Sequence, residues 1–215
     1  MLPQKVLGER YIGCGSSGKN LILEGTPGNA LGAYLDNSEI TLYGNAQDAT
    51  GDTMNDGLIT IHGNTGDAVG YAMRGGTIYI KGNAGYRAGI HMKEYKEKKP
   101  VLVIGGRAGS FLGEYQAGGL IIVLGIDIEG ASAGNFCGTG MHGGKIFLRT
   151  KVTPNDLPTQ VEAQPATDED FEQIMPYING FCERFGTDKS IFAKEDFTVL
   201  RPNSKNPYKQ LYVLN

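Results

Sequence analysis

The chain has 215 residues, of which 33 are glycine and none is tryptophan, and its formal net charge at pH 7 is -3. A mildly acidic protein does not attract nucleic acid or an acidic membrane surface, so neither is expected as a partner. The 3 cysteines stand far apart, which supports neither a disulfide framework nor a zinc site, and each is expected to be a small buried residue. The first ten residues lack the apolar core of a secretion signal, and we expect a cytoplasmic protein.

A glycine-rich stretch near the beginning, Gly13 to Asn20, is one residue short of a phosphate-binding loop. Asn20 stands where a serine or threonine would hold a metal ion. The segment that follows, "NLILEG", alternates like a strand, whereas a phosphate loop needs a helix at this point. This stretch is therefore interpreted as part of a repeat rather than as a nucleotide site.

The repeat has a period of nineteen residues, seen in "GDTMNDGLITIHGN" from Gly51 and "GYAMRGGTIYIKGN" from Gly70. Two insertions extend the same column of glycines toward the carboxyl end. Such a period indicates that the chain returns to the same place one strand spacing further along. The column predicts seven coils, with these structural glycines: Gly13, Gly32, Gly51, Gly70, Gly89, Gly113 and Gly138.

Each coil contains a short alternating segment that predicts a strand with one buried face. The predicted fold is an all-β, right-handed parallel β-helix, a single-stranded solenoid of about seven 19-residue coils, which occupies residues 5–150. A further column, from Leu35 through Met54 to Met141, is expected to fill the core. The predicted inward pairs are Leu21 and Leu23, Ile40 and Leu42, Ile59 and Ile61, Ile78 and Ile80, Leu102 and Ile104, Ile121 and Val123, and Ile146 and Leu148.

Two insertions interrupt the period, one within residues 91–100 and one within residues 125–135. Extra residues in a solenoid must leave the stack as surface loops. The first insertion carries alternating charge and a tyrosine, so it is either a solvated loop or a contact with a partner. Its residues form the candidate partner interface: Lys93, Glu94, Tyr95, Lys96, Glu97, Lys98 and Lys99.

Residues 151–215 form the predicted C-terminal tail, in which glycine is rare and prolines appear. An amphipathic helix is expected after Thr167 as N-cap, ending at Gly186 and kinked at Pro176. Its apolar stripe would cover an open end or a side of the solenoid. The final "KNPYKQLYVLN" is expected to be an extended arm. The stripe consists of Phe171, Ile174, Met175, Ile178, Cys182 and Phe185.

No catalytic, cofactor-binding or metal-binding residue emerges from the sequence. His62 is expected on the outer side of its strand and exposed to solvent, while His91 and His142 belong to no ligand pattern. Asp48 and Asp67 share a column one coil apart, so they could perturb each other's pKa, although exposed acidic pairs are common.

The repeated G-x-x-G-x-x-x-G pattern, with "GNTGDAVGYAMRGGTIYIKGNAGYRAGIHMKEY", closely resembles the carboxyl-terminal β-helix (GXGXG) domain of glutamate synthase. The segments "YIGCG", "PGNALGAYL" and "GNAQDATGDTMNDG" are similar to the stand-alone, archaeal-type form, in which this domain is a separate subunit. The third subunit of formylmethanofuran dehydrogenase shares the repeat and is the competing resemblance.

The first resemblance implies a non-catalytic scaffold of the complex that makes two glutamates from glutamine and 2-oxoglutarate. It implies partners with the chemistry, an amidotransferase chain and a synthase chain that carries FMN and an iron-sulfur cluster, and no cofactor on this chain. Cys14 is internal, so it does not match the amino-terminal nucleophile of that family. A homo-oligomer and an independent ligand-binding or enzymatic solenoid remain open alternatives.

Overall fold

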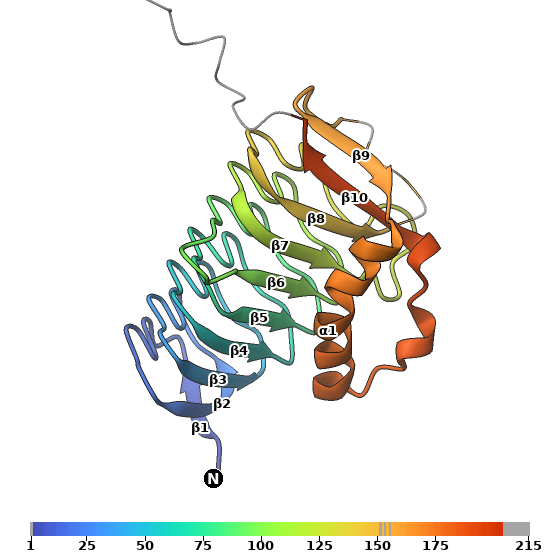
Figure 1. Ribbon diagram of the computed structural model, residues 1–215. Coiled ribbons are helices and arrows are strands. Elements are labelled where there is room, and N and C mark those ends of the chain that lie inside the picture. The colour runs from blue at the N-terminus through green and yellow to red at the C-terminus, as the bar shows by residue number, and fades with distance from the viewer. Residues whose placement is uncertain (1, 151, 153, 155, 204–215) are drawn as a thin grey trace, which may run out of the picture.

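The computed structural model describes residues 2–150, 152, 154 and 156–203, and it contains one ten-stranded sheet (Figure 1). Strands β1 to β8 follow each other in chain order and pair in parallel. Their bounds are β1 Gln4–Leu7, β2 Asn20–Thr26, β3 Ser38–Tyr43, β4 Gly57–Ile61, β5 Thr77–Ile80, β6 Val101–Ile104, β7 Ala117–Val123 and β8 Gly143–Arg149. The predicted solenoid is thereby confirmed. Strand β1, which the repeat did not predict, extends it at the amino end.

The register of the strands agrees with the predicted inward pairs. Ile40 lies between Leu21 and Ile59 in neighbouring strands, and Leu42 lies between Leu23 and Ile61. All the predicted inward residues except Leu21 are buried. Leu21 is only partly buried because it lies near the open end of the stack. Burial of one aliphatic side chain contributes about 1.5–3 kcal/mol, so each coil adds a favourable layer. The methionine column is also fully buried, which confirms its role in the core.

The glycine column forms a corner at which three residues in each coil adopt left-handed backbone conformations, with one residue between each. In the third coil these are Ala49, Gly51 and Thr53, with φ of 57°, 69° and 51°. A Cβ atom on Gly51 would lie 2.4 Å from Cδ1 of the buried Ile78. In this coil the middle position therefore faces the core and has no free space for a side chain, whereas the two flanking positions accept one at the cost of backbone strain.

The tail continues the sheet in the opposite direction. Strand β10 (Phe197–Pro202) pairs antiparallel with β8, and β9 (Val161–Pro165) pairs antiparallel with β10. The two strands close the carboxyl end of the solenoid (Figure 1), which was not predicted. Two short 3-10 helices, Lys189–Ile191 and Lys194–Asp196, precede β10.

Helix α1 (Asp168–Phe185) covers the outer face of the sheet beside β5 to β8 (Figure 1). Thr167 and Asp170 form a capping box at its beginning, and Gly186 ends it with φ of 68°. Both termini agree with the prediction, and Pro176 lies inside the helix, although its kink stays a prediction. The apolar stripe is confirmed as well, with Phe181 as a fully buried member that the stripe had omitted.

Two predictions about the tail remain predictions. The segment "KNPYKQLYVLN" lies outside the described residues, so its extended conformation is not tested. The division of the chain at residue 150 is also not tested.

Candidate functional site

The histidines do not lie together in a ligand set. Over residues 2–150, 152, 154 and 156–203, no group of three or more histidine, cysteine or acidic side chains is placed to hold a metal ion. The expectation that His62 is exposed was wrong. The end of α1 partly buries it, with its ring stacked 4.5 Å from Tyr43 and edge-on to Phe185 at 5.1 Å. Burial, and then the charge of Lys81, lower the pKa of His62.

The acidic column has a backbone role. The Oδ1 atom of Asp48 accepts a hydrogen bond from the amide of Asp67 at 2.9 Å, and Asp67 accepts one from the amide of Tyr86 at 2.8 Å. Asn64 and Asn83 accept similar bonds from the next coil. These side chains extend the ladder of coil-to-coil hydrogen bonds around the corners, which gives each a structural function.

The cysteines differ from one another in their surroundings. Cys137 is fully buried, and burial raises the pKa of its thiol to about 12. Cys182 is half-buried on α1. Cys14 is exposed, contrary to the expectation of a buried residue, because it follows Gly13 at a corner of the first coil. Ile12, two residues before Cys14, packs against the core instead.

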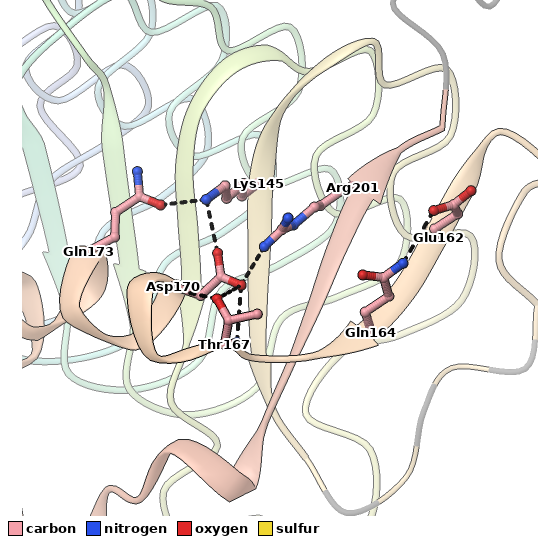
Figure 2. A network of polar contacts seen from close by, with 7 residues as sticks. All are labelled: Lys145, Glu162, Gln164, Thr167, Asp170, Gln173 and Arg201. Atoms are coloured by element: carbon pink, nitrogen blue, oxygen red, sulfur yellow. Dashed lines mark hydrogen bonds and ion pairs between the residues drawn. The ribbon is translucent and has the colours of Figure 1, made fainter.

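A polar network joins α1 to the end of the solenoid (Figure 2). Asp170 is 1% exposed, accepts a hydrogen bond from Lys145 Nζ at 2.9 Å, and pairs with Arg201. Lys145 on β8 also donates to Gln173, and Arg201 lies on β10. Burial alone would raise the pKa of Asp170, but the bonds from Lys145 and Thr167 outweigh it, so the pKa is lowered. The network locks together three elements that are distant in sequence.

The first insertion is an ordered loop that folds back over the solenoid. Tyr95 and Lys98 exchange two backbone hydrogen bonds of 3.1 Å, which closes a tight turn. Lys98 forms ion pairs of 3.2 Å with Asp36 and with Asp56, on two earlier coils. Glu94 accepts a hydrogen bond from the amide of Gly119. Lys93, Tyr95, Lys96, Glu97 and Lys99 are exposed. The loop therefore presents a fixed surface, and its use as an interface stays a prediction.

The second insertion borders a mixed-charge hollow of about 670 Å³. Its lining includes Asp127 and Glu129 from the insertion and Arg149 from the end of β8. Arg149 already donates to the carbonyl oxygens of Leu124 and Ile191, and it lies 3.6 Å from Asp196. Among the described residues, Arg149 is the only positively charged side chain that lines this hollow, and other parts of the protein already bind it.

The glycine corner of the later coils presents a group of aromatic side chains and one arginine that the sequence analysis did not single out. Five of its members stand at the flanking left-handed positions, where a residue other than glycine costs about 1–2 kcal/mol. The earlier coils place alanine at several equivalent positions, among them Ala30, Ala49 and Ala68, so the stack does not need large side chains there. We call this group the corner surface; it comprises Tyr86, Arg87, His91, Phe111, Tyr115 and Phe136.

Two rows of neighbouring rings form the corner surface. Phe111 lies between Tyr86 and Phe136, with ring centres 5.2 and 5.0 Å away, and the rings of His91 and Tyr115 stack at 5.1 Å. The guanidinium of Arg87 lies 5.0 Å from the centre of the Tyr86 ring and donates to the buried carboxylate of Glu114 at 2.8 Å. Glu114 adjoins Tyr115 in the chain, so this ion pair links the rows.

Large side chains two residues before or after the repeated glycine were the signal that could have identified this surface. The column alignment contains Arg87, Phe111 and Phe136 before the glycines, and His91 and Tyr115 after them. The sequence alone did not show that these backbone positions are left-handed. Their strain and their shared exposure became visible only in the structure.

The fold and this surface define a β-solenoid protein with an aromatic corner and an ordered side loop. The chain belongs to the GXGXG motif family, whose sequence pattern matches residues 4–203. The archaeon Methanocaldococcus jannaschii has a relative, named uncharacterized protein MJ1350, that is 48% identical over 218 residues. The alignment covers 97% of this chain and 84% of that protein.

The left-handed corner explains the spacing of the glycines in this chain in physical terms. Glycines alternate with other residues in "GCG" and "GTG" because every second corner residue has a positive φ. Within the described part of the chain, no helix is long and apolar enough to cross a membrane.

Proposed function

We propose that this chain is the scaffold subunit of a glutamate synthase complex. In this complex the solenoid holds an amidotransferase chain against a synthase chain that carries FMN and an iron-sulfur cluster, while the reaction itself takes place on those partners. The observation that carries the proposal is the GXGXG family match over residues 4–203. The resemblance of the quoted repeats to the stand-alone glutamate synthase subunit supports the choice of this particular complex.

The use of the polar side chains supports a scaffold. Asp48, Asp67 and Asn64 are occupied in coil-to-coil hydrogen bonds, and Asp170 joins the helix to the end of the stack. A rigid solenoid that exposes rings and an ordered loop is suited to hold other chains. The proposed place of the complex is the cytoplasm, and the proposal leaves room for two or more copies of this chain in it.

The test is to isolate the tagged chain from its own cells under native conditions and to identify the bound proteins. The eluate is assayed for flavin absorbance and for glutamate formation that depends on glutamine and 2-oxoglutarate. Recovery of the amidotransferase and flavin chains with activity would support the proposal. A molybdenum or tungsten enzyme would instead favour the formylmethanofuran dehydrogenase resemblance, and recovery of the chain alone would favour an independent solenoid.

Replacement of residues 93–99 by a short Gly/Ser link should leave the solenoid folded and weaken partner recovery. The pairs of Lys98 with Asp36 and Asp56 are partly exposed, so their loss should change the unfolding free energy by no more than about 1 kcal/mol. Urea unfolding measures the stability, and quantitative pull-down measures partner binding.

The matched control is the same replacement of residues 127–131 in the second insertion. This replacement shortens another surface loop but leaves residues 93–99 intact. Equal partner recovery from the wild-type chain and the 93–99 variant would reject this loop as a docking site.

A further inference from the structure

We propose that the corner surface, together with the adjoining loop of residues 93–99, docks a protein partner whose contact face is acidic and carries aliphatic side chains. This inference rests on the proposed function in one respect, since it takes the partner to be one of the catalytic chains of the complex. The proposal assigns a binding role to residues of the corner that the repeat itself does not require.

The size of the side chains at the left-handed positions is the first argument. Arg87, His91, Phe111, Tyr115 and Phe136 all have φ between 54° and 60°, a region that disfavours residues with side chains. Glycine occupies the equivalent positions Gly15 and Gly140, which shows that the corner can form without a side chain there. Left-handed residues with side chains occur in every coil, but only the coils of Gly89 and Gly113 have large side chains at both flanking positions. Large side chains that the fold does not require at strained, exposed positions indicate a binding role.

The arrangement of the side chains is the second argument. Tyr86, Tyr115 and Phe136 are 38%, 37% and 45% exposed, so each keeps a free surface although the rings pack against one another. The contacts between the rings and the pairing of Arg87 with Glu114 hold the group in one conformation before a partner arrives. Rigid tyrosine, phenylalanine and arginine side chains are characteristic of the energetically dominant part of protein interfaces.

Local charge identifies the chemistry of the partner. The loop of residues 93–99 begins two residues after His91 and contains four lysines and two glutamates. Lys98 is engaged by Asp36 and Asp56, so the rest of the loop carries 3 - 2 = +1, although the whole chain carries -3. Glu94 is hydrogen-bonded to Gly119, which lies four residues after Tyr115, so the loop begins beside the corner surface. Lys96 and Lys99 are exposed. A positive rim beside exposed rings fits an acidic face with aliphatic groups at its centre.

The test compares matched truncations in the full-length chain, isolated from its own cells with its bound proteins. Tyr115→Ala should lower the recovery of the partner about tenfold or more. Tyr34→Ala should leave it unchanged, because Tyr34 stands at the equivalent left-handed position, is 54% exposed and lies on an early coil outside the corner surface. The double variant Lys96→Glu/Lys99→Glu should also lower recovery, and increasingly so at low salt. Urea unfolding of each variant checks that the solenoid remains intact.

A photoreactive phenylalanine analogue at position 115 provides a readout that does not depend on truncation. It should crosslink to an acidic segment of a catalytic chain, whereas the analogue at Tyr43, an exposed residue at the end of β3, should not. Crosslinking to an acidic segment of a protein from another complex would support the corner surface and overturn the glutamate synthase assignment.

Two results would overturn the docking proposal. Recovery of both catalytic chains without a crosslink at position 115, and with Tyr115→Ala and Tyr34→Ala behaving alike, would reject the corner surface and leave the scaffold proposal standing. A crosslink only to a second copy of this chain, or no crosslink and no bound protein, would reject the docking of an acidic partner. Absence of the catalytic chains would in addition reject the scaffold proposal.

Discussion

Replacement of Gly51 with alanine should lower the unfolding free energy of the solenoid by about 2–5 kcal/mol, whereas Gly70→Ala should lower it by only about 1–2 kcal/mol. Both glycines have φ of 69° and occupy the same column. They differ in what the new Cβ atom would meet: Cδ1 of Ile78 at 2.4 Å for Gly51, but no atom closer than Sδ of Met73 at 3.8 Å for Gly70.

The comparison separates two reasons for the glycine column. The left-handed backbone disfavours any side chain equally at both positions, which sets the smaller loss. At Gly51 the added methyl also forces the terminal Cδ1 atom of Ile78 to move, within a fully buried side chain that lies between Ile59 and Leu102. Overpacking of a dense core adds about 1–3 kcal/mol.

Urea unfolding of the two variants, followed by circular dichroism, measures the difference. Gly15→Ala serves as a control at a flanking left-handed position, since a Cβ atom there meets nothing within 4 Å. Equal losses for Gly51→Ala and Gly70→Ala would show that backbone conformation alone accounts for the glycines, and that Ile78 adjusts freely.

The register of the solenoid could be predicted because its signal repeats. An error of one residue would turn every inward pair to the outer face, so Ile40 and Leu42 fix the alignment of their neighbours. The beginning and the end of α1 could also be predicted, because Thr167 and Gly186 act through local backbone geometry. Local and repeated features of this chain were therefore accessible from the sequence.

The two strands that close the carboxyl end of the solenoid could not be predicted in this way. Strands β9 and β10 pair with each other although α1 separates them in the sequence. Val199 pairs with Phe147 of β8, more than fifty residues earlier in the chain. No repeat specifies such pairing. His62 lies on the outer side of its strand as predicted, but its partial burial was missed for the same reason, because Phe185, which covers it, comes from the distant end of α1.

The polar lock around Asp170 leads to the second prediction of large effect. Asp170→Asn should lower the unfolding free energy at pH 7 by about 1.5–3 kcal/mol, because the amide removes the negative charge that Lys145 and Arg201 share. The loss stays below that of a fully buried pair because the side chains of Lys145 and Arg201 are 28% and 37% exposed and keep contact with water. Asp168→Asn is the matched control in the same helical turn, since its side chain is 85% exposed and its pair with Lys194 lies in solvent, so this variant should be as stable as the wild-type chain.

The pH dependence distinguishes lost charge from lost packing. The pKa of Asp170 is lowered in the folded chain, so its carboxylate stabilises the fold above the unfolded value of 3.8 and this stabilisation is lost as the pH falls through the folded value. The stability difference between the wild-type chain and Asp170→Asn should therefore be constant between about pH 7 and pH 5 and shrink below about pH 4. Urea unfolding at pH 7, 5 and 3 measures it. A difference that persists unchanged at pH 3 would show that Asp170 acts through packing and helix capping, and that its charge does not hold the helix to the solenoid.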